Sequence, residues 1–380
     1  MDLELTDSQL RVRDLMRRFG VERLAQAGIE TDRTHRFPAE IIKELGELGI
    51  MGIFVPETYG GAGMDHVSYA LAIEEISVHC AATGVIVSAH SSLAVWPILG
   101  LGTEDQKRRF LPEMAAGRHI GCFALTEPQA GSDAAGQKTR AVRDGDSYVI
   151  NGTKNFITNG PQASVAIVFA MTDPSAGHHG ISAFIVDTRT PGWQVVRNED
   201  KMGIHGAHSA QLSFSDMRLP ADCLLTEEGQ GFKVAMKTLD GGRIGIAAQA
   251  VGIARAALEE SLKYASQRRA FGSTIGSFQA IQWKLADMAV EVDAARLLTL
   301  QAAALKDAGK VHTKQSAMAK LFAAETAMKA ATEALQIHGG YGYTKEFKVE
   351  RLFRDAKITE IYEGTSEIQR LVIAGQVLGR

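Results

Sequence analysis

The sequence predicts a mainly α-helical protein with a β domain in the middle of the chain. The 380 residues are too many for one ordinary core. Apolar residues recur at helical spacing toward both ends, and short β-rich runs separated by Gly, Asn and Asp lie between them. We therefore expect an N-terminal helical domain over residues 1–120, a small antiparallel β-barrel or sandwich over 121–226, and a C-terminal four-helix bundle over 227–380.

The N-terminal domain is expected to consist of helices around one glycine-rich loop. Residues 59–63 hold too many glycines for a helix. Two mostly apolar helical segments follow at about residues 66–79 and 84–99, and their lack of a polar face implies burial. We expect Pro97 and the glycines that follow it to end the second segment. No apolar run is expected to reach the ~20 residues of a membrane span.

The middle domain shows the pattern of short strands. Residues 142–146 form a turn signal, and residues 148–150 follow it with β-branched and aromatic side chains, which predicts a hairpin. Further β-rich runs occur at residues 164–170, 181–186 and 211–214. This spacing favours an antiparallel barrel or sandwich over a parallel sheet.

The C-terminal domain has longer and more regular apolar stripes. Residues 244–262, 281–295 and 321–335 each carry apolar side chains at steps of three and four. A further helix is expected to start at Ser366, since Ser366 and Gln369 resemble a capping box, with Leu371 on its buried face. Four such helices favour an antiparallel bundle.

Residues 361–370 contain Glu363, the carboxylate that is the strongest candidate for a catalytic group. Glu363 lies between apolar residues and Gly364, where a carboxylate can be partly desolvated while the backbone approaches a flat ligand. The N-terminal amides of the following helix favour anions. An ordinary cap or a solvated charge is the alternative.

Charge and cysteine content exclude several classes of protein. A net charge of −3, with both signs mixed along the chain, gives no support for nucleic acid or an anionic membrane as partner. Cys80, Cys122 and Cys223 form neither a CxxC pair nor an even disulfide framework, which favours a reducing compartment. The N-terminus lacks the features of a signal or transit peptide. We expect a cytoplasmic protein, or a mitochondrial matrix protein if a transit peptide was removed.

Several common sites are missing from the sequence. There is neither a Gly-x-Gly-x-x-Gly after a strand nor a Walker-type loop, so a dinucleotide would not be held in the Rossmann manner. The histidines are scattered, and no metal site is expected. A nucleophile elbow for Ser-His-Asp chemistry is also absent.

Four glycine-rich or polar stretches remain as candidates. Residues 124–136 leave backbone amides open to a ligand, or form a long surface turn. Residues 154–160 present an aromatic beside a hydroxyl, or pack in the core. In residues 268–272 an arginine could pair with a phosphate, or complete a basic helix end. Residues 336–343 contain more glycines than a simple helix stop needs.

These stretches resemble a known family. Residues 124–136 and residues 336–355, with Gln-x-x-Gly-Gly-x-Gly-Tyr-x-x-Glu followed by Arg351 and Asp355, are similar to the two signature patterns of acyl-CoA dehydrogenases. The resemblance covers essentially the whole chain, in the order helical domain, β domain, helical bundle. Residues 241–247 and 361–376 look most like the short-chain and short branched-chain members.

The resemblance implies FAD as cofactor. The residues implied to hold it are Phe123, Leu125, Thr126, Gly131, Ser132, Phe156, Ile157, Thr158, Arg268, Phe271, Gln279, Gln336, Gly339, Gly340, Thr365 and Glu367. The first eight of these would face the isoalloxazine ring. Arg268, Phe271 and Gln279 would reach the cofactor of a neighbouring subunit, which implies a homotetramer. Many relatives carry tryptophan where this chain has Phe156.

The resemblance also implies a substrate site and a reaction. The positions implied to touch the acyl-CoA are Ser132, Asp240, Arg243, Tyr362 and Gly364. Glu363 matches the catalytic base that removes the α-proton, while flavin N5 accepts the β-hydride and a trans-2-enoyl-CoA forms. A minority of members place the base near Gly241 and Gly242, where these glycines cannot serve.

The resemblance of residues 241–247 and 361–376 to short-chain members implies dehydrogenation of a short acyl-CoA of about four carbons, straight or branched. A blocked pocket would reject longer chains. Trp96 is one candidate for the floor of that pocket, and ordinary core packing is the alternative. Electrons would pass to electron transfer flavoprotein, in fatty acid β-oxidation or branched-chain amino acid degradation. Two rivals share the scaffold: a flavin-dependent oxidase or monooxygenase, and a non-dehydrogenating flavoprotein.

Overall fold

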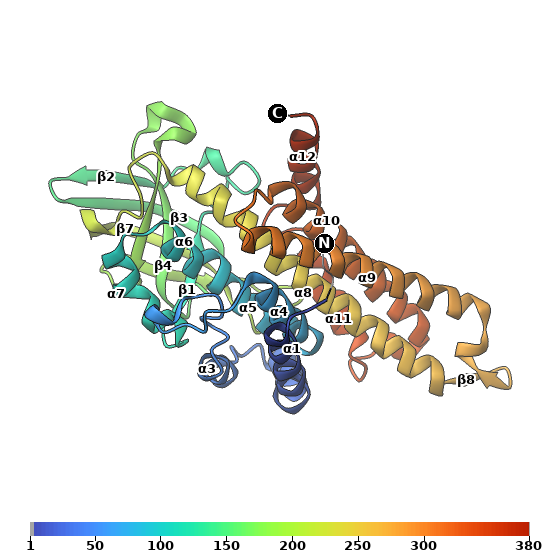
Figure 1. Ribbon diagram of the computed structural model, residues 1–380. Coiled ribbons are helices and arrows are strands. Elements are labelled where there is room, and N and C mark those ends of the chain that lie inside the picture. The colour runs from blue at the N-terminus through green and yellow to red at the C-terminus, as the bar shows by residue number, and fades with distance from the viewer. Residues whose placement is uncertain (1–3, 380) are drawn as a thin grey trace.

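The computed structural model describes residues 4–379. Helices precede and follow one strand-rich unit in the chain, and this unit lies at the left of Figure 1, with the C-terminal bundle extending to the right. The N-terminal helices are α1 (Asp7–Phe19), α2 (Ala25–Thr34), α3 (Ala39–Glu47), α4 (His66–His79), α5 (Ala81–Ser88), α6 (Trp96–Leu101) and α7 (Glu104–Ala115). The expected helix over residues 66–79 is confirmed, and nearly all of its side chains are buried, as its lack of a polar face implies.

The second apolar helix is longer than the sequence indicated. A π-helical segment, Ala89–Val95, joins α5 to α6, so the helix runs from Ala81 to Leu101. The expectation that Pro97 ends it was wrong. Pro97 occupies the first turn of α6, where its missing N–H is not required, and the wider π turn precedes it.

This helix also corrects the expectation about apolar runs. The segment Ala81–Leu101 has 21 residues, and by length and composition it could cross a membrane. However, 78% of its most apolar window is buried inside the protein. A buried core helix of a soluble protein has the same composition, so we interpret the segment as the central helix of the N-terminal domain.

The strand-rich unit is a seven-stranded sheet with the order β1-β4-β2-β3-β7-β6, and β5 pairs with β4. Its strands are β1 (Ile120–Ala124), β2 (Arg140–Asp144), β3 (Ser147–Thr158), β4 (Ala163–Met171), β5 (Ile181–Asp187), β6 (Trp193–Asn198) and β7 (Ser209–Pro220). The predicted hairpin is confirmed, with Asp144 opposite Ser147. The sheet is not purely antiparallel, because β4 runs parallel to β1 and, at one residue pair, to β2.

The C-terminal part begins with three long helices, as expected. Its elements are α8 (Gly231–Gln267), β8 (Arg269–Ala270), β9 (Ser273–Thr274), α9 (Gln279–Asp307), α10 (Thr313–His338), α11 (Val349–Thr359) and α12 (Ser366–Val377). The sequence analysis did not predict α11, which packs on α8 and α10 through Val349, Leu352 and Ala356. The C-terminal helix α12 packs on α10 near the strand-rich unit (Figure 1).

The start of α12 differs in detail from the predicted capping box. Thr365, not Ser366, caps the helix, since its Oγ1 accepts a hydrogen bond from the N–H of Ile368 at 3.3 Å. Leu371 is 68% exposed, so its expected place on a buried face was also wrong. The Gln369 side chain turns back toward the carbonyls of residues 363 and 364 instead of capping the helix.

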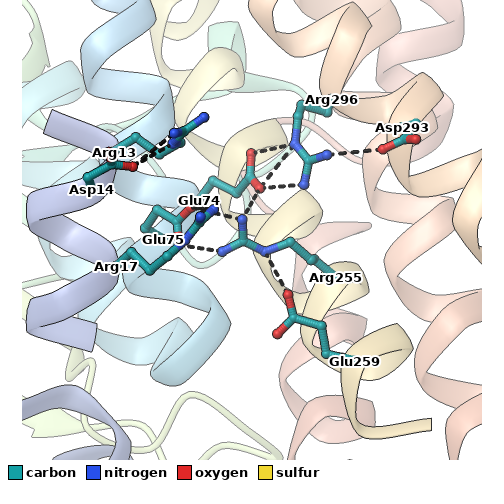
Figure 2. A network of polar contacts seen from close by, with 9 residues as sticks. All are labelled: Arg13, Asp14, Arg17, Glu74, Glu75, Arg255, Glu259, Asp293 and Arg296. Carbon is teal, nitrogen blue, oxygen red and sulfur yellow. Dashed lines mark hydrogen bonds and ion pairs between the residues drawn. The ribbon is translucent and has the colours of Figure 1, made fainter. Parts of the chain in front are cut away.

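Buried ion pairs join the N-terminal helices to the bundle (Figure 2). Glu74 and Glu75 on α4 are both almost fully buried. Arg255 on α8 contacts Glu74 at 2.9 Å and Glu75 at 2.6 Å. Arg296 on α9 contacts Glu74 at 2.7 Å, and Arg17 on α1 contacts Glu75 at 2.9 Å. Four helices are therefore held together by charges that compensate one another.

We predict that Arg255→Met destabilises the protein by ~3 to 5 kcal/mol, because it leaves two buried carboxylates without their shared partner. The measurement is urea unfolding followed by circular dichroism. Glu259→Gln is the matched control, since Glu259 is 57% exposed and lies 3.5 Å from the same guanidinium. A loss of ~1 kcal/mol or less in both variants would contradict the assigned role of Arg255.

Candidate active site

Glu363 lies in the turn between α11 and α12, with the backbone in the left-handed region. Its φ is +50°, and that of Gly364 is +88°. A non-glycine residue held at positive φ costs on the order of 1 to 3 kcal/mol and persists only where its surroundings enforce it. Such strain is common at functional sites, and here it directs the Glu363 side chain toward α8.

The carboxylate of Glu363 is enclosed beside Gly242 of α8. A Cβ atom at position 242 would lie 2.0 Å from Glu363 Oε2 and 2.7 Å from Leu93 Cδ2, so the carboxylate occupies the space that a larger residue would fill. Among the described residues, Oε2 is buried without a hydrogen-bond partner. Burial raises the pKa of Glu363 to about 8, while the positive charges of Lys320 and Arg243 pull it down.

Two buried side chains hold the backbone of this turn. Lys320 on α10 donates from Nζ to the carbonyl oxygen of Gly364 at 2.8 Å. Gln369 on α12 donates from Nε2 to the carbonyl oxygens of Glu363 at 3.1 Å and Gly364 at 2.9 Å. The turn is therefore fixed from two different helices.

Polar side chains close the space around Glu363 on the side of the N-terminal helices. The Tyr362 hydroxyl donates to Gln249 Oε1, and Gln249 Nε2 donates to the carbonyl of Ala81 at 2.8 Å. Tyr69 donates to Ser88 Oγ at 3.0 Å, and both of these side chains lie against Gly245, close to one helical turn beyond Gly242. These polar side chains use their hydrogen bonds on partners other than the Glu363 carboxylate.

The predicted substrate residues Asp240 and Arg243 form a pair on the same helix. Arg243 Nη1 lies 2.7 Å from Asp240 Oδ1, and Thr313 at the start of α10 donates to Asp240 Oδ2 at 2.6 Å. The Arg243 side chain is only 5% exposed, and its Nε atom has no partner among the described residues. This pair lies at the helix positions next to Gly241 and Gly242.

A buried ion pair shapes the loop that the sequence singled out at residues 124–136. Lys154 Nζ lies 2.9 Å from Glu127 Oε1 and also donates to the carbonyl of Leu125 at 3.0 Å. Glu127 accepts the N–H groups of Lys138 at 2.6 Å and Thr139 at 2.9 Å. Burial alone would raise the pKa of Glu127, but these partners lower it to about 2.

The predicted flavin residues on this loop and on β3 differ in exposure. Phe156 is 62% exposed and has a φ of +57°, so its ring stands out from the sheet. Gly131 and Ser132 are exposed, and Phe123, Thr126 and Thr158 are half-buried. Leu125 and Ile157 are buried.

Thr365 and Glu367 lie at the start of α12, and the remaining predicted cofactor residues gather at the far end of the bundle. A surface cavity of about 490 Å³ is lined by Arg268, Gly339 and Gly340 together with Tyr264, Ile275, Ile337, His338, Tyr341 and Thr344. Phe271, three residues after Arg268, is 98% exposed. Gln279 is the first residue of α9, and Gln336 lies in the last turn of α10. The β8 hairpin lies at the end of the bundle remote from the sheet (Figure 1). One chain therefore carries two separate halves of the predicted cofactor site.

These two halves fit the parts of a flavin dinucleotide. A Cβ at Gly339 or Gly340 would meet no atom within 4 Å, so the backbone is open to close approach, and Arg268 supplies a cation for a phosphate. At the other half, the exposed Phe156 ring offers a flat apolar face. The donor set thus suits an anionic linker and a planar ring.

Comparison with known proteins identifies the family. The N-terminal, middle and C-terminal domains of acyl-CoA dehydrogenase match residues 6–118, 122–217 and 229–378. The chain belongs to the acyl-CoA dehydrogenase family. It is 52% identical over 376 residues to the mitochondrial short-chain specific acyl-CoA dehydrogenase of Bos taurus, a match that covers 99% of this chain and 91% of that protein.

Solved acyl-CoA dehydrogenase structures share the whole fold. Butyryl-CoA dehydrogenase from Megasphaera elsdenii is 49% identical, with a TM-score of 0.98 over 100% of both chains. A chain solved in work on the electron transferring flavoprotein of Acidaminococcus fermentans is also 49% identical, with a TM-score of 0.99 over 100% of both chains. The acyl-CoA dehydrogenase resemblance and the mainly helical fold with its strand-rich middle are confirmed.

Membership of the acyl-CoA dehydrogenase family makes the protein an FAD-dependent oxidoreductase that acts on acyl-CoA thioesters.

The sequence patterns gave no role to Lys320 or to the Glu127–Lys154 pair. The sequence did contain an indication that Lys320 is buried. Lys320 lies at helical spacing from the apolar stripe of α10 and among alanines, where a lysine is unexpected. The Glu127–Lys154 pair had no such signal, because its members are 27 residues apart.

We predict that Gly242→Ala lowers turnover by ~10²-fold, because the new methyl group forces the Glu363 carboxylate to move, and small misplacements have effects of this size. The substitution favours the helix by ~1 kcal/mol, so stability should not fall for lack of helix propensity. Steady-state kinetics measure the loss, with flavin absorbance and the thermal unfolding midpoint as controls. Wild-type turnover in the variant would contradict the close contact.

Proposed function

We propose that the protein dehydrogenates a short-chain acyl-CoA to a trans-2-enoyl-CoA, with Glu363 as the base that removes the α-proton. One observation carries this proposal. Glu363 is half-buried, its Oε2 atom is buried and unpartnered in the described chain, and desolvation raises its pKa to about 8. A carboxylate in this state can accept a proton near neutral pH and is not engaged by a competing donor.

The backbone at Glu363 supports a second role. Within residues 4–379 its N–H group donates no hydrogen bond, although it lies in a turn whose carbonyls are clamped. An N–H fixed in this way can bind the thioester carbonyl oxygen as charge develops there. The same residue would then supply both the base and a donor that makes the α-proton more acidic.

Bound FAD would supply the acceptor for the hydride that leaves the β-carbon. Residues of this chain would orient it: Phe156, Thr126 and Thr158 at the ring, with Thr365 and Glu367 nearby. Asp240 and Arg243, with Ser132 and Gly364, would hold the thioester and its CoA arm.

The packing of polar side chains near Glu363 supports the proposed preference for about four carbons. Tyr69 and Ser88 fill the space at Gly245, and Tyr362 is fixed to Gln249. A longer chain would have to separate these buried hydrogen-bonded pairs, and each unsatisfied polar group costs ~1 to 3 kcal/mol. Trp96 contributes less than its size suggests, because its ring lies under the Lys306 ammonium at 4.8 Å and against Gly100.

Electron transfer flavoprotein is the proposed electron acceptor. The similarity to a chain solved in work on the electron transferring flavoprotein of Acidaminococcus fermentans supports this acceptor. Fatty acid β-oxidation and branched-chain amino acid degradation are the proposed pathways, in the cytoplasm. Both pathways generate acyl-CoA thioesters of the proposed length.

A homotetramer is the proposed assembly, because one chain carries the two halves of its cofactor site at opposite ends. A stripe of exposed apolar residues supports association: Trp283, Val290 and Leu297 on α9 are 65%, 69% and 50% exposed at seven-residue spacing. Such a stripe on one helix face is typical of a surface buried between subunits.

We predict that Glu363→Gln retains FAD and acyl-CoA binding and loses ~10²-fold to 10⁴-fold of turnover, the range of a general base. Rapid kinetics with butyryl-CoA under anaerobic conditions, followed by flavin bleaching, measure the loss. Substantial residual bleaching would place the base elsewhere. Steady peroxide formation by the wild type would instead favour the oxidase.

Arg268→Ala is expected to release FAD and to weaken the assembly together, because Arg268 would contact the cofactor of a neighbouring subunit. Size-exclusion chromatography with light scattering, combined with flavin absorbance, tests both effects. Lys43→Met on α3 is the matched control, with a side chain that is 79% exposed. A wild-type monomer that retains FAD would rule out the shared cofactor site.

We expect kcat/KM to be highest for butyryl-CoA or isobutyryl-CoA and to fall for hexanoyl-CoA and octanoyl-CoA. Tyr69→Phe should leave this order intact, because it removes one hydroxyl, whereas Gln249→Ala should open space and raise the relative rate with hexanoyl-CoA. A preference of the wild type for octanoyl-CoA defeats the proposed chain length.

A further inference from the structure

We propose that Lys320 is a positioning residue for Glu363: its ammonium fixes the turn that carries the carboxylate and favours the ionised form of the base without binding it. The inference rests on the proposed role of Glu363. Its closing experiment separates a failure of that role from a failure of the assignment to Lys320.

Lys320 is fully buried on α10, an uncommon state for a lysine. Its neighbours in sequence on this helix include the buried residues Ala319, Ala323 and Ala324. Its ammonium donates a hydrogen bond to the carbonyl oxygen of Gly364 at 2.8 Å. None of the ion pairs in the described chain includes Lys320. Burial of an ammonium costs several kcal/mol unless nearby groups compensate it. Glu363 is the nearby carboxylate with the largest effect on Lys320, ahead of Glu360 and Glu367.

The contact with the carbonyl, and not with the carboxylate, matters for catalysis. A direct ion pair would occupy the oxygen that must accept the α-proton and would strongly stabilise its ionised form. Here the Lys320 ammonium holds the residue after Glu363, and Glu363 Oε2 stays without a partner in the described chain. The positive charge acts on the base through space, and the carboxylate remains free.

Gln369 shares the backbone contact but carries no charge. Its side-chain amide bonds to the carbonyls of Glu363 and Gly364, and the residue is fully buried. Both donors oppose relaxation of the left-handed turn at Glu363. Removal of each donor therefore affects the geometry, and only removal of Lys320 affects the charge.

Other charged groups near Glu363 do not replace Lys320. Arg243 on α8 also lowers the pKa of Glu363, but its guanidinium is paired with Asp240 at 2.7 Å. Tyr362 and Tyr69 have raised pKa values and stay neutral. Lys320 itself also faces Glu360, Glu367 and Arg243. The Lys320 ammonium is thus the cation near Glu363 that lacks an ion-paired carboxylate of its own.

The direction of the pH effect follows from these charges. Glu363 acts as a base only when it is ionised, so kcat/KM rises with pH through its pKa. Lys320 lowers that pKa, and burial lowers the pKa of Lys320 to about 8. Loss of the cation therefore moves the rising limb of the profile to higher pH.

The test compares the pH profile of kcat/KM in Lys320→Met and Gln369→Met, with Lys43→Met as the surface control. We expect the rising limb of Lys320→Met to move up by at least ~1 pH unit, the lower end of the effect of an adjacent opposite charge. Gln369→Met should lower kcat without moving the limb, and Lys43→Met should match the wild type. An unmoved limb in Lys320→Met, or an equal shift in Gln369→Met, would overturn the proposal.

A second readout does not depend on turnover. Infrared titration of the carboxyl band that disappears in Glu363→Gln reports the protonation of Glu363 directly. Lys320→Arg should keep the wild-type midpoint, and Lys320→Gln should raise it even if Lys320→Met fails to fold. If Glu363→Gln remains active, the proposed base is wrong. If Glu363→Gln is inactive and neither neutral variant raises the midpoint, only the role of Lys320 is wrong.

Discussion

The active site depends on a half-buried carboxylate, one oxygen of which is buried without a partner in the described chain. Glu363 is held at positive φ against Gly242, and its Oε2 atom accepts no hydrogen bond from the described chain. Burial opposes ionisation, and the charges of Lys320 and Arg243 favour it. A glycine at position 242 is a steric requirement, because any side chain there would occupy the place of the carboxylate.

Several other buried charges of the protein are paired, and their pairing keeps the site in place. Glu74 and Glu75 bind arginines from α1, α8 and α9 and so fix α8, which carries Gly242 and Arg243 (Figure 2). Lys154 and Glu127 neutralise each other beneath the loop of residues 124–136. The paired charges thus stabilise the fold, while the unpaired carboxylate remains available for catalysis.

Local patterns in the sequence were sufficient for much of this account. The apolar stripes predicted the long helices, the turn signal at residues 142–146 predicted the hairpin, and Glu363 stood out beside Gly364. Features set by tertiary contacts were not predictable in this way. The π segment before Pro97, the parallel pairing of β1 with β4, and the burial of Lys320 against the carbonyl of Gly364 depend on partners distant in sequence.

The most direct test of the central claim is exchange of the α-hydrogens of butyryl-CoA with deuterium from the solvent. The holoenzyme is incubated in D₂O without an electron acceptor, and mass spectrometry measures deuterium at the α-carbon. If Glu363 removes the α-proton, the wild type incorporates deuterium and Glu363→Gln, loaded with FAD, does not. Incorporation by Glu363→Gln at the wild-type rate would contradict the account.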